Sequence, residues 1–297
     1  MSKAIGMTLI DNRIVKTPKE KAGRNVWAYV LLCSLAVIMV YPFFWLLFGS
    51  FKSNTELFTS LNLIPKEFIL DSYLKGWKGT GDNTYSLFFL NTFEMVLPTV
   101  VFTVFSSAVV AYGFARFNFP FKRILFTLMI STLMLPQTVI ILPRYILFRN
   151  FGWLDSYLPF IAPAVLAGYP FFVFMMIQFF RGIPRELDES AVIDGCNPFT
   201  ILIRILLPLA KPALFSAAIF QFIWMWNDFF NSLIFINSVK KYTISLALRI
   251  AIDSTGGTTN WNEILAMSVL AVLPPMLIFF FAQRYFVEGI ATTGIKG

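Results

Sequence analysis

The sequence contains no histidine and only two cysteines, Cys33 and Cys196. The lack of histidine removes the side chain that most often binds metals or acts as a general base near neutral pH. Two cysteines so far apart form neither a metal-binding spacing nor a disulfide framework. Charged residues are also scarce, at 13% of the chain against roughly 25% in a soluble domain. We therefore expect no catalytic residue, no metal site and no cofactor-binding site in this chain.

Apolar residues are abundant instead. They make up 57% of the 297 residues, and phenylalanine alone occurs 35 times. A soluble domain with this composition would expose large apolar patches and aggregate. The composition excludes an ordinary cytosolic enzyme, a disordered chain and a nucleic-acid-binding domain, and it favours a protein in the lipid bilayer. The net charge of +8 fits the Lys and Arg of cytoplasmic loops, so we expect no nucleic-acid partner.

Apolar runs long enough to cross a bilayer occur six times, since a membrane helix needs about 20 mostly apolar residues. The predicted spans are Val26–Phe48, Met95–Ala115, Ile124–Leu142, Leu158–Phe180, Ala213–Ile236 and Ile264–Ala282. The expected fold is thus an all-α, polytopic membrane protein with six transmembrane helices. Residues 26–287 would form the membrane domain, between an N-terminal arm, 1–25, and a C-terminal tail, 288–297.

Lys and Arg residues indicate which loops face the cytoplasm. They are concentrated in the N-terminal arm, in the loop after the second span, in residues 181–212 and in the tail. Basic loops stay on the cytoplasmic side of a membrane. We therefore expect a multi-pass protein with both termini in the cytoplasm.

Prolines occur within or beside several predicted spans, at Pro42, Pro98, Pro136, Pro163, Pro170, Pro274 and Pro275. A proline frees backbone carbonyls, which neighbouring groups or cavity water must then satisfy. Two interpretations fit: kinks within a packed bundle, or a translocation path lined by irregular helices.

The loop between the fourth and fifth spans, residues 181–212, has the clearest local pattern. Pro184 and the acidic residues after it favour the start of a helix, and Gly195 can end that helix in the left-handed conformation. Asn197 and Pro198 then predict a second, mostly apolar helix that stops at Pro208. The apolar faces of this pair need cover, either from the ends of the spans and lipid headgroups or from a groove in a partner.

This loop resembles the EAA motif of permease subunits in bacterial ABC importers, which reads Glu-Ala-Ala, three residues, Gly, nine residues, then Ile-x-Leu-Pro. The matching positions are Glu189, Ser190, Ala191, Gly195, Ile205, Leu207 and Pro208, and the one departure is the small Ser190. The segments Tyr41–Lys52, Ala111–Phe117, the stretch around Leu135 and the ending Gln283–Gly297 are similar to the smaller six-span permease of maltose-type carbohydrate importers. The resemblance thus covers nearly the whole chain.

The resemblance implies a bacterial cell-membrane subunit that pairs with a second permease, in an expected heterodimer. Two ATP-binding subunits, which hold the ATP and Mg, would dock below, and an extracellular solute-binding protein would deliver the carbohydrate, expected to be an oligosaccharide. The residues implied to couple the path to the ATPase are Glu189, Ser190, Ala191, Asp194, Gly195 and Pro208. The sequence has no Gly-x-x-x-x-Gly-Lys-Ser/Thr phosphate loop of its own.

Two further sets of residues are candidates for contacts on the path. Sugar sites combine aromatic stacking with amide and carboxylate hydrogen bonds, and the residues of those types at suitable depth are Asn91, Glu94, Gln137, Trp224, Trp226, Asn227 and Asp228. A packing role for each tryptophan is an open alternative. Gly256 and Gly257, in the predicted outer loop 238–262, are candidates for contact with the binding protein, or belong to a hairpin without a partner.

Two other functions remain to be weighed. A self-sufficient carrier or channel for a small polar solute is the alternative, although it should show internal repeats and buried ionisable groups, and neither is evident. An intramembrane enzyme lacks support, because the sequence contains neither His-Glu-x-x-His nor Gly-x-Ser-x-Gly.

Overall fold

The structure is a computed structural model that describes residues 26–79, 83–253 and 260–294. The chain divides into two compact units, Met1–Trp45 and Leu46–Gly297, which are described separately. The described part of the first unit is one apolar helix, α1 (Val26–Gly49), which continues four residues into the second unit. Pro42 lies inside α1 without interrupting it. The predicted N-terminal arm, 1–25, lies outside the described residues.

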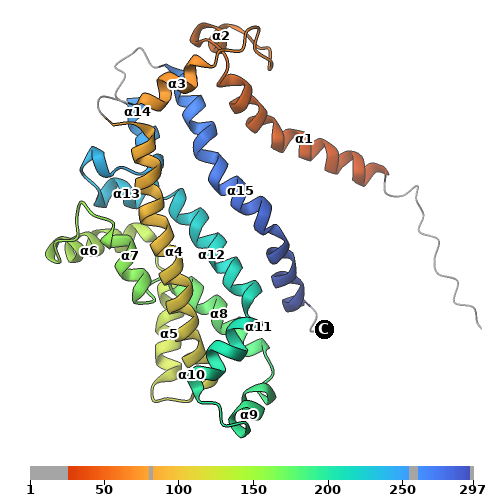
Figure 1. The fold of residues 1–297 in the computed structure, drawn as a ribbon, viewed down its shortest axis with the longest axis vertical. Helices are drawn as coiled ribbons and strands as arrows, with labels where there is room; N and C mark the ends of the chain where they lie inside the picture. Colours follow the sequence, from red (N-terminus) through yellow and green to blue (C-terminus); the bar gives the residue numbers. More distant parts are fainter. Residues whose placement is uncertain (1–25, 80–82, 254–259, 295–297) are drawn as a thin grey trace, which may run out of the picture. The chain divides into compact units, whose positions relative to one another are not determined.

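The second unit consists of helices joined by short loops (Figure 1). It begins with two short helices, α2 (Asn54–Thr59) and α3 (Asp71–Lys78). The long helix α4 (Tyr85–Arg116) follows them. Two pairs of shorter helices come next, α5 (Lys122–Leu133) with α6 (Gln137–Asn150), and α7 (Leu158–Val165) with α8 (Pro170–Gly182).

The second half of this unit begins with the loop that contains the motif. Its helical pieces are α9 (Glu186–Ile193), α10 (Pro198–Ile201), the π-helical turn η2 (Leu202–Leu206) and α11 (Leu207–Leu209). Beyond them follow α12 (Lys211–Trp226), α13 (Phe229–Phe235), the 3₁₀ turn η3 (Val239–Lys241), α14 (Ile244–Asp253) and α15 (Trp261–Gly294). The loop helices α9 and α10 lie at one end of α4, and α3 and α14 lie at the other (Figure 1).

Four helical segments of the described chain are long and apolar enough to cross a membrane, and the number rises to six if each of two bent helix pairs is one span. The four are Val26–Gly49, Tyr85–Arg116, Leu158–Gly182 and Trp261–Gln283; the bent pairs are α5 with α6 and the segment Pro198–Leu209 with α12. The all-α membrane architecture expected from the sequence is therefore present. The last helix runs to Gly294, past the predicted end at Ala282.

Three predicted spans are not single straight helices. The third breaks at Met134–Pro136, where α5 and α6 meet at 106°, because proline cannot donate a backbone hydrogen bond and disfavours helix at the preceding residue. The fourth breaks before Pro170, where Ala167 has φ +54°. The fifth ends at Trp226 and not at Ile236, because the Asp228 carboxylate accepts the backbone N–H of Asn231 at 3.1 Å and begins α13 instead.

Two clusters of buried side chains hold this unit together, and α4 contributes to both. The first gathers around Met95, Val96, Trp226 and Met267, and the second gathers around Ala111, Met176, Phe180 and Leu206. The small residues Ala108, Ala111 and Ala115 on α4 allow close approach of the neighbouring helices, as is usual between membrane helices. The second cluster lies on the side of α4 that leads to the motif loop.

Asp155 joins two loops at the opposite end of the unit. Its carboxylate accepts the backbone N–H groups of Asn237 and Ser238, the Ser238 hydroxyl at 2.6 Å and the Lys241 ammonium at 3.2 Å. The hydrogen bond from the Ser238 hydroxyl is the main reason why the pKa of Asp155 lies well below its usual value. The ionised form of Asp155 therefore stabilises the connection between the α6–α7 loop and the segment after α13.

Replacing Asp155 by alanine is expected to destabilise the protein by about 2 kcal/mol, since four donors lose a charged acceptor. The pKa is lower in the folded state, so the stabilising contribution is complete above the unfolded value of 3.8. It is lost as the pH falls below that value towards the folded pKa. Thermal unfolding in detergent from pH 7 to pH 3 measures both effects. The control is Asp71→Ala, because the Asp71–Lys75 pair is exposed and is expected to contribute almost nothing; an equal loss for both variants contradicts the interpretation.

Candidate substrate pocket and coupling loop

A pocket of about 400 Å³ lies where the three helix breaks come together. The break between α5 and α6 contributes Leu135, the break between α7 and α8 contributes Gly168 and Tyr169, and the end of α12 contributes Asp228. The full lining is Thr132, Leu133, Leu135, Gln137, Ile140, Arg144, Phe160, Pro163, Gly168, Tyr169, Pro170, Phe171, Phe172, Gln221, Trp224, Met225, Asp228 and Asn231. Irregular backbone within a membrane is tolerated where it lines a cavity. These breaks therefore favour a translocation path lined by irregular helices over simple kinks in a packed bundle.

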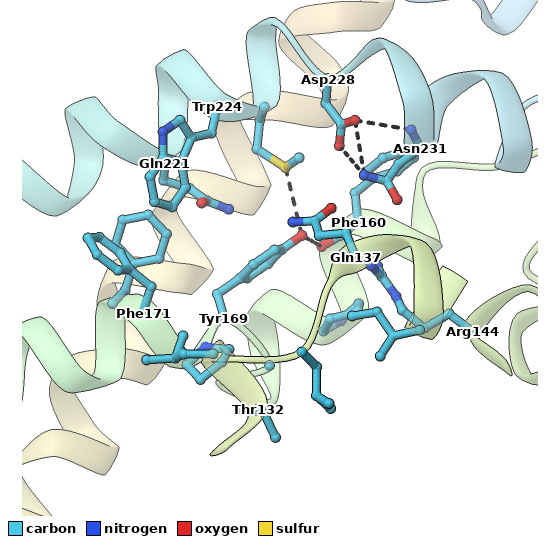
Figure 2. A pocket seen from close by; sticks show the side chains of 18 residues that line it. Thr132, Gln137, Arg144, Phe160, Tyr169, Phe171, Gln221, Trp224, Asp228 and Asn231 are labelled. Atoms are coloured by element: carbon cyan, nitrogen blue, oxygen red, sulfur yellow. Dashed lines mark hydrogen bonds between the residues drawn. The ribbon is translucent and has the colours of Figure 1, made fainter. Parts of the chain in front are cut away.

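One wall of the pocket is aromatic (Figure 2). Trp224 is 48% exposed and packs against the rings of Phe171 and Phe172 at centroid distances of 5.0 and 5.3 Å. Tyr169 lies between this wall and the polar one, and its hydroxyl donates to the carbonyl of Phe160 at 3.1 Å. The ring of Phe220 lies 6.1 Å from the indole as well, and the exposed part of Trp224 contributes aromatic surface to the pocket.

The opposite wall carries Arg144, Asp228 and Asn231, whereas Gln221 lies beside Trp224 (Figure 2). Asp228 and Asn231 are joined by hydrogen bonds of 2.8 and 3.0 Å from the Asn231 amide. The Arg144 guanidinium lies over the rings of Phe148 and Phe235, at 5.5 and 5.7 Å from their centroids, and this contact holds a cation beside the pocket. The wall therefore presents a carboxylate, amides and a guanidinium that suit hydroxyl-rich solutes.

The structure brings together three of the seven residues that the sequence analysis proposed for the path. Gln137, Trp224 and Asp228 line the pocket, whereas Asn91, Glu94, Trp226 and Asn227 do not. Asn91 is buried and donates to the carbonyls of Lys240 and Tyr242, Glu94 is exposed on α4, and Asn227 donates to the Ile223 carbonyl within its own helix.

Trp226 packs in the core. This is the alternative that the sequence analysis left open for each tryptophan. Trp226 is only 3% exposed, stacks on Phe222 at 5.3 Å and donates its indole N–H to the Ala271 carbonyl at 3.0 Å. The two neighbouring tryptophans, Trp224 and Trp226, thus point into different surroundings, the first into the pocket and the second into the core.

Sequence reasoning missed five polar residues of the pocket: Thr132, Arg144, Tyr169, Gln221 and Asn231. Gln221 had a usable signal, because it is a lone amide within the apolar helix α12. Arg144 lies two residues past the predicted end of the third span, in what the hydropathy pattern predicts to be a loop. Tyr169 and Asn231 carry no pattern that sets them apart from other polar residues near the ends of helices.

The motif loop forms the helix pair that its sequence predicts. Gly195 adopts φ +81° after α9, and the Asn197 side chain accepts the backbone N–H of Thr200 at 2.8 Å to begin α10. Two details differ from the prediction. Pro184 precedes the first helix, which begins at Glu186. The second helix continues through the π-helical turn η2 and ends at Leu209, one residue past the predicted stop at Pro208.

The six motif residues occupy different surroundings within this loop. Ala191 is 4% exposed and packs in the second cluster, and the Ser190 hydroxyl donates to the Glu186 carbonyl at 2.8 Å. Ser190, the one departure from the motif, therefore fits α9 without taking up space on the buried face of that helix. The other four, Glu189, Asp194, Gly195 and Pro208, are exposed.

Apolar side chains surround the glycine turn on its exposed side. Ile193 is 86% exposed and Phe199 is 67% exposed, and Val192 lies beside them on α9. Because α9 and α10 are short and carry large exposed apolar residues next to acidic ones, this surface fits a partner protein better than free solvent. We call Val192, Ile193 and Phe199 the coupling surface.

The remaining expectations concern the candidate contacts with the binding protein and metal binding. Gly256 and Gly257 lie outside the described residues. Over the described ranges, no group of three or more His, Cys, Asp or Glu side chains is arranged to hold a metal ion.

Comparisons with known proteins all point to one family of transport proteins. The sequence model of the family described as "Binding-protein-dependent transport system inner membrane component" matches residues 104–292, which include the pocket and the motif loop. The arabinooligosaccharides transport system permease protein AraQ of Bacillus subtilis is 35% identical over 266 residues, which are 89% of this chain and 92% of AraQ. The sn-glycerol-3-phosphate transport system permease protein UgpE of Pectobacterium atrosepticum is 30% identical over 276 residues, 92% of this chain and 98% of UgpE.

A solved structure has the same fold. It is a crystal structure of a bacterial ABC transporter involved in the import of the acidic polysaccharide alginate, and one of its chains superposes with a TM-score of 0.76 at 21% identity. The superposition covers 91% of this chain and 100% of that chain. The broken helices, the motif loop and the family match agree, and the chain belongs to the family of binding-protein-dependent transport system inner membrane components.

Proposed function

We propose that this chain is the membrane-spanning permease subunit of an ATP-driven carbohydrate importer, and that it forms half of the translocation path. It would act with a second permease, a pair of ATP-binding subunits that hold ATP and Mg, and an extracellular solute-binding protein. The observation that carries the proposal is the coupling surface, where Ile193 and Phe199 are exposed on both sides of the Gly195 turn. A self-sufficient carrier has no need of such a surface.

The pocket supports the choice of a carbohydrate. Trp224 offers an aromatic face, and Gln137, Asp228 and Asn231 offer hydrogen-bonding groups at the opposite wall. A sugar ring has an apolar face of C–H groups and a rim of hydroxyls, so it matches this division of the lining. The names of the relatives AraQ and UgpE, which refer to arabinooligosaccharides and sn-glycerol-3-phosphate, are consistent with a hydroxyl-rich substrate. Among these, an oligosaccharide is our proposal.

The proposed topology has six spans, with each bent helix pair counted as one span. The basic residues near the motif loop support a topology in which that loop and both termini would lie in the cytoplasm. The N-terminal arm 1–25 and the tail 288–297 would then lie on the same side as the ATP-binding subunits, and the loop with Gly256 and Gly257 would face the binding protein.

Gentle extraction of the tagged chain from its native membrane, followed by mass spectrometry of the proteins that co-purify, tests this proposal. The expected result is one further permease, one ATP-binding protein and a solute-binding protein, with ATP hydrolysis by the purified complex. Sugar released from the denatured binding protein identifies the substrate. Recovery of the chain alone, in several detergents and after cross-linking, would contradict the proposal and favour the self-sufficient carrier or channel.

A further inference from the structure

The last turn of α4 is fastened to the motif loop by one ion pair and three hydrogen bonds. The Nε atom of Arg116 lies 2.7 Å from Oδ2 of Asp188 on α9, and the two side chains are only 6% and 19% exposed. The Nη2 atom of the same guanidinium donates to the Ile183 carbonyl at 3.1 Å. A charged pair with so little exposure is screened weakly by water, and breaking it leaves a buried charge without its partner.

The two remaining contacts extend this attachment over the whole loop. The Tyr112 hydroxyl donates to the Pro198 carbonyl at 3.0 Å, which fixes the start of α10. Arg185 donates to the Ala115 carbonyl at 3.4 Å, just ahead of α9. The helices before and after the Gly195 turn are therefore both attached to the same end of α4. A displacement of the coupling surface must move that end or break these contacts.

The middle of α4 contacts one residue that lines the pocket and one residue next to the lining. Gln221, which lines the pocket on α12, donates to the Thr103 hydroxyl at 3.3 Å. The Ser106 hydroxyl donates to the Ala164 carbonyl at 2.6 Å, at the end of α7 beside the helix break. The segment from Thr103 to Arg116 is unbroken helix without proline and is about 20 Å long at 1.5 Å per residue. It is a stiff connection between the motif loop and the pocket walls.

We propose that the Arg116–Asp188 ion pair is the positioning contact through which movement of the motif loop reaches α4 and reshapes the pocket. Arg116 and Asp188 touch neither the substrate nor ATP; they act by holding α9 to α4. This inference rests on the proposed function, since it assumes an ATPase that moves the coupling surface. It predicts that, when the ion pair is lost, ATP hydrolysis continues but no longer produces the full change in the pocket.

The test uses the complex isolated from the native membrane and a reporter cysteine in the pocket. Cys33 and Cys196 are replaced by serine, and Thr132→Cys places one thiol in the pocket lining. The rate of maleimide labelling is measured without nucleotide and with ATP and vanadate, alongside the rate of ATP hydrolysis. In the complex with the ion pair intact, we expect nucleotide trapping to change the labelling rate.

With Arg116→Met we expect hydrolysis to persist while the nucleotide-dependent change in labelling shrinks by roughly two- to thirtyfold, the range by which residues between coupled sites alter coupling. Arg116→Lys, which keeps the charge, should restore part of the change. The matched control is Arg123→Met, which removes an exposed charge near the same end of the unit and should leave the labelling change intact.

An undiminished labelling change in Arg116→Met would overturn the proposal. If that variant fails to assemble, Asp188→Asn decides in its place, because asparagine keeps the shape and removes only the charge. Failure of both variants to assemble would assign the pair a purely structural role and also overturn the proposal. The proposed function fails in a different way, when the complex with the intact pair shows no ATP hydrolysis and no labelling change.

Discussion

Replacing Gly195 by aspartate is expected to abolish uptake while the chain still inserts and assembles. A non-glycine residue at φ +81° costs about 1–2 kcal/mol in the left-handed region, which strains the turn. A Cβ at this position meets no atom of the chain within 4 Å, so the bulk would extend into the space that the proposed ATP-binding partner would occupy. Uptake should fall by at least about thirtyfold, the effect of losing a contact worth about 2 kcal/mol at an interface.

The chain offers a closely matched control for this prediction. Gly152, in the turn after α6, also has a positive φ of +68°, and a Cβ added there would likewise enter open space. Gly152→Asp therefore introduces the same charge and a similar strain at a site away from the coupling surface. Uptake of the sugar recovered from the binding protein, and co-purification of the ATPase, are measured for both variants. Equal loss in both would assign the effect to strain, and normal uptake by Gly195→Asp would refute the coupling role.

The second large effect separates the two neighbouring tryptophans of α12. Trp226→Ala should lower thermal stability strongly, by about 3–5 kcal/mol, because it leaves a large cavity in the core and removes the hydrogen bond to the Ala271 carbonyl. Trp224→Ala should leave the melting temperature in detergent nearly unchanged. It should instead raise the KM for uptake by about fivefold, the equivalent of losing about 1 kcal/mol of aromatic stacking.

Melting curves and uptake kinetics of the two purified variants check this contrast. Trp224→Phe is the conservative control, because it keeps an aromatic face at the pocket wall and should restore most of the affinity. A Trp224→Ala variant that melts early with an unchanged KM would place Trp224 in the packing and remove it from the path.

The motif loop was predictable from sequence because local rules determine it. Glycine is favoured at a positive φ such as that of Gly195, and Asn197 with Pro198 is a start signal that acts within three residues. The helix breaks were only partly predictable. Prolines indicated where backbone hydrogen bonds would be missing, but Pro42 and Pro98 lie inside continuous helices while Pro136 and Pro170 lie at breaks. Packing around each proline decides between these outcomes, and hydropathy does not contain that information.

The pocket was harder to predict than the loop for a related reason. Trp224 and Trp226 have the same chemistry and are two residues apart, so they project from different sides of α12. Only the tertiary arrangement shows that one side faces Phe171 and the other faces Ala271. Arg144 was missed because the bend at Pro136 turns α6 by 106° and carries a residue beyond the expected span back to the pocket.

The three helix breaks also determine how this pocket can change its width. A wall made of continuous helices changes only when whole helices slide or tilt against their packed neighbours, which disturbs the entire core. Here the helices that line the pocket are interrupted around Met134, Ala167 and Asn227, so changes in a few backbone dihedrals are enough to redirect the helices that follow. In the proposed mechanism, movement of α4 would reach these breaks through the contacts of Thr103 and Ser106, and small rotations at the breaks would change the width of the pocket. The width of the pocket thus depends on the directions of the helices beside the breaks. It can change without repacking of the large interfaces that α4 makes with its neighbours.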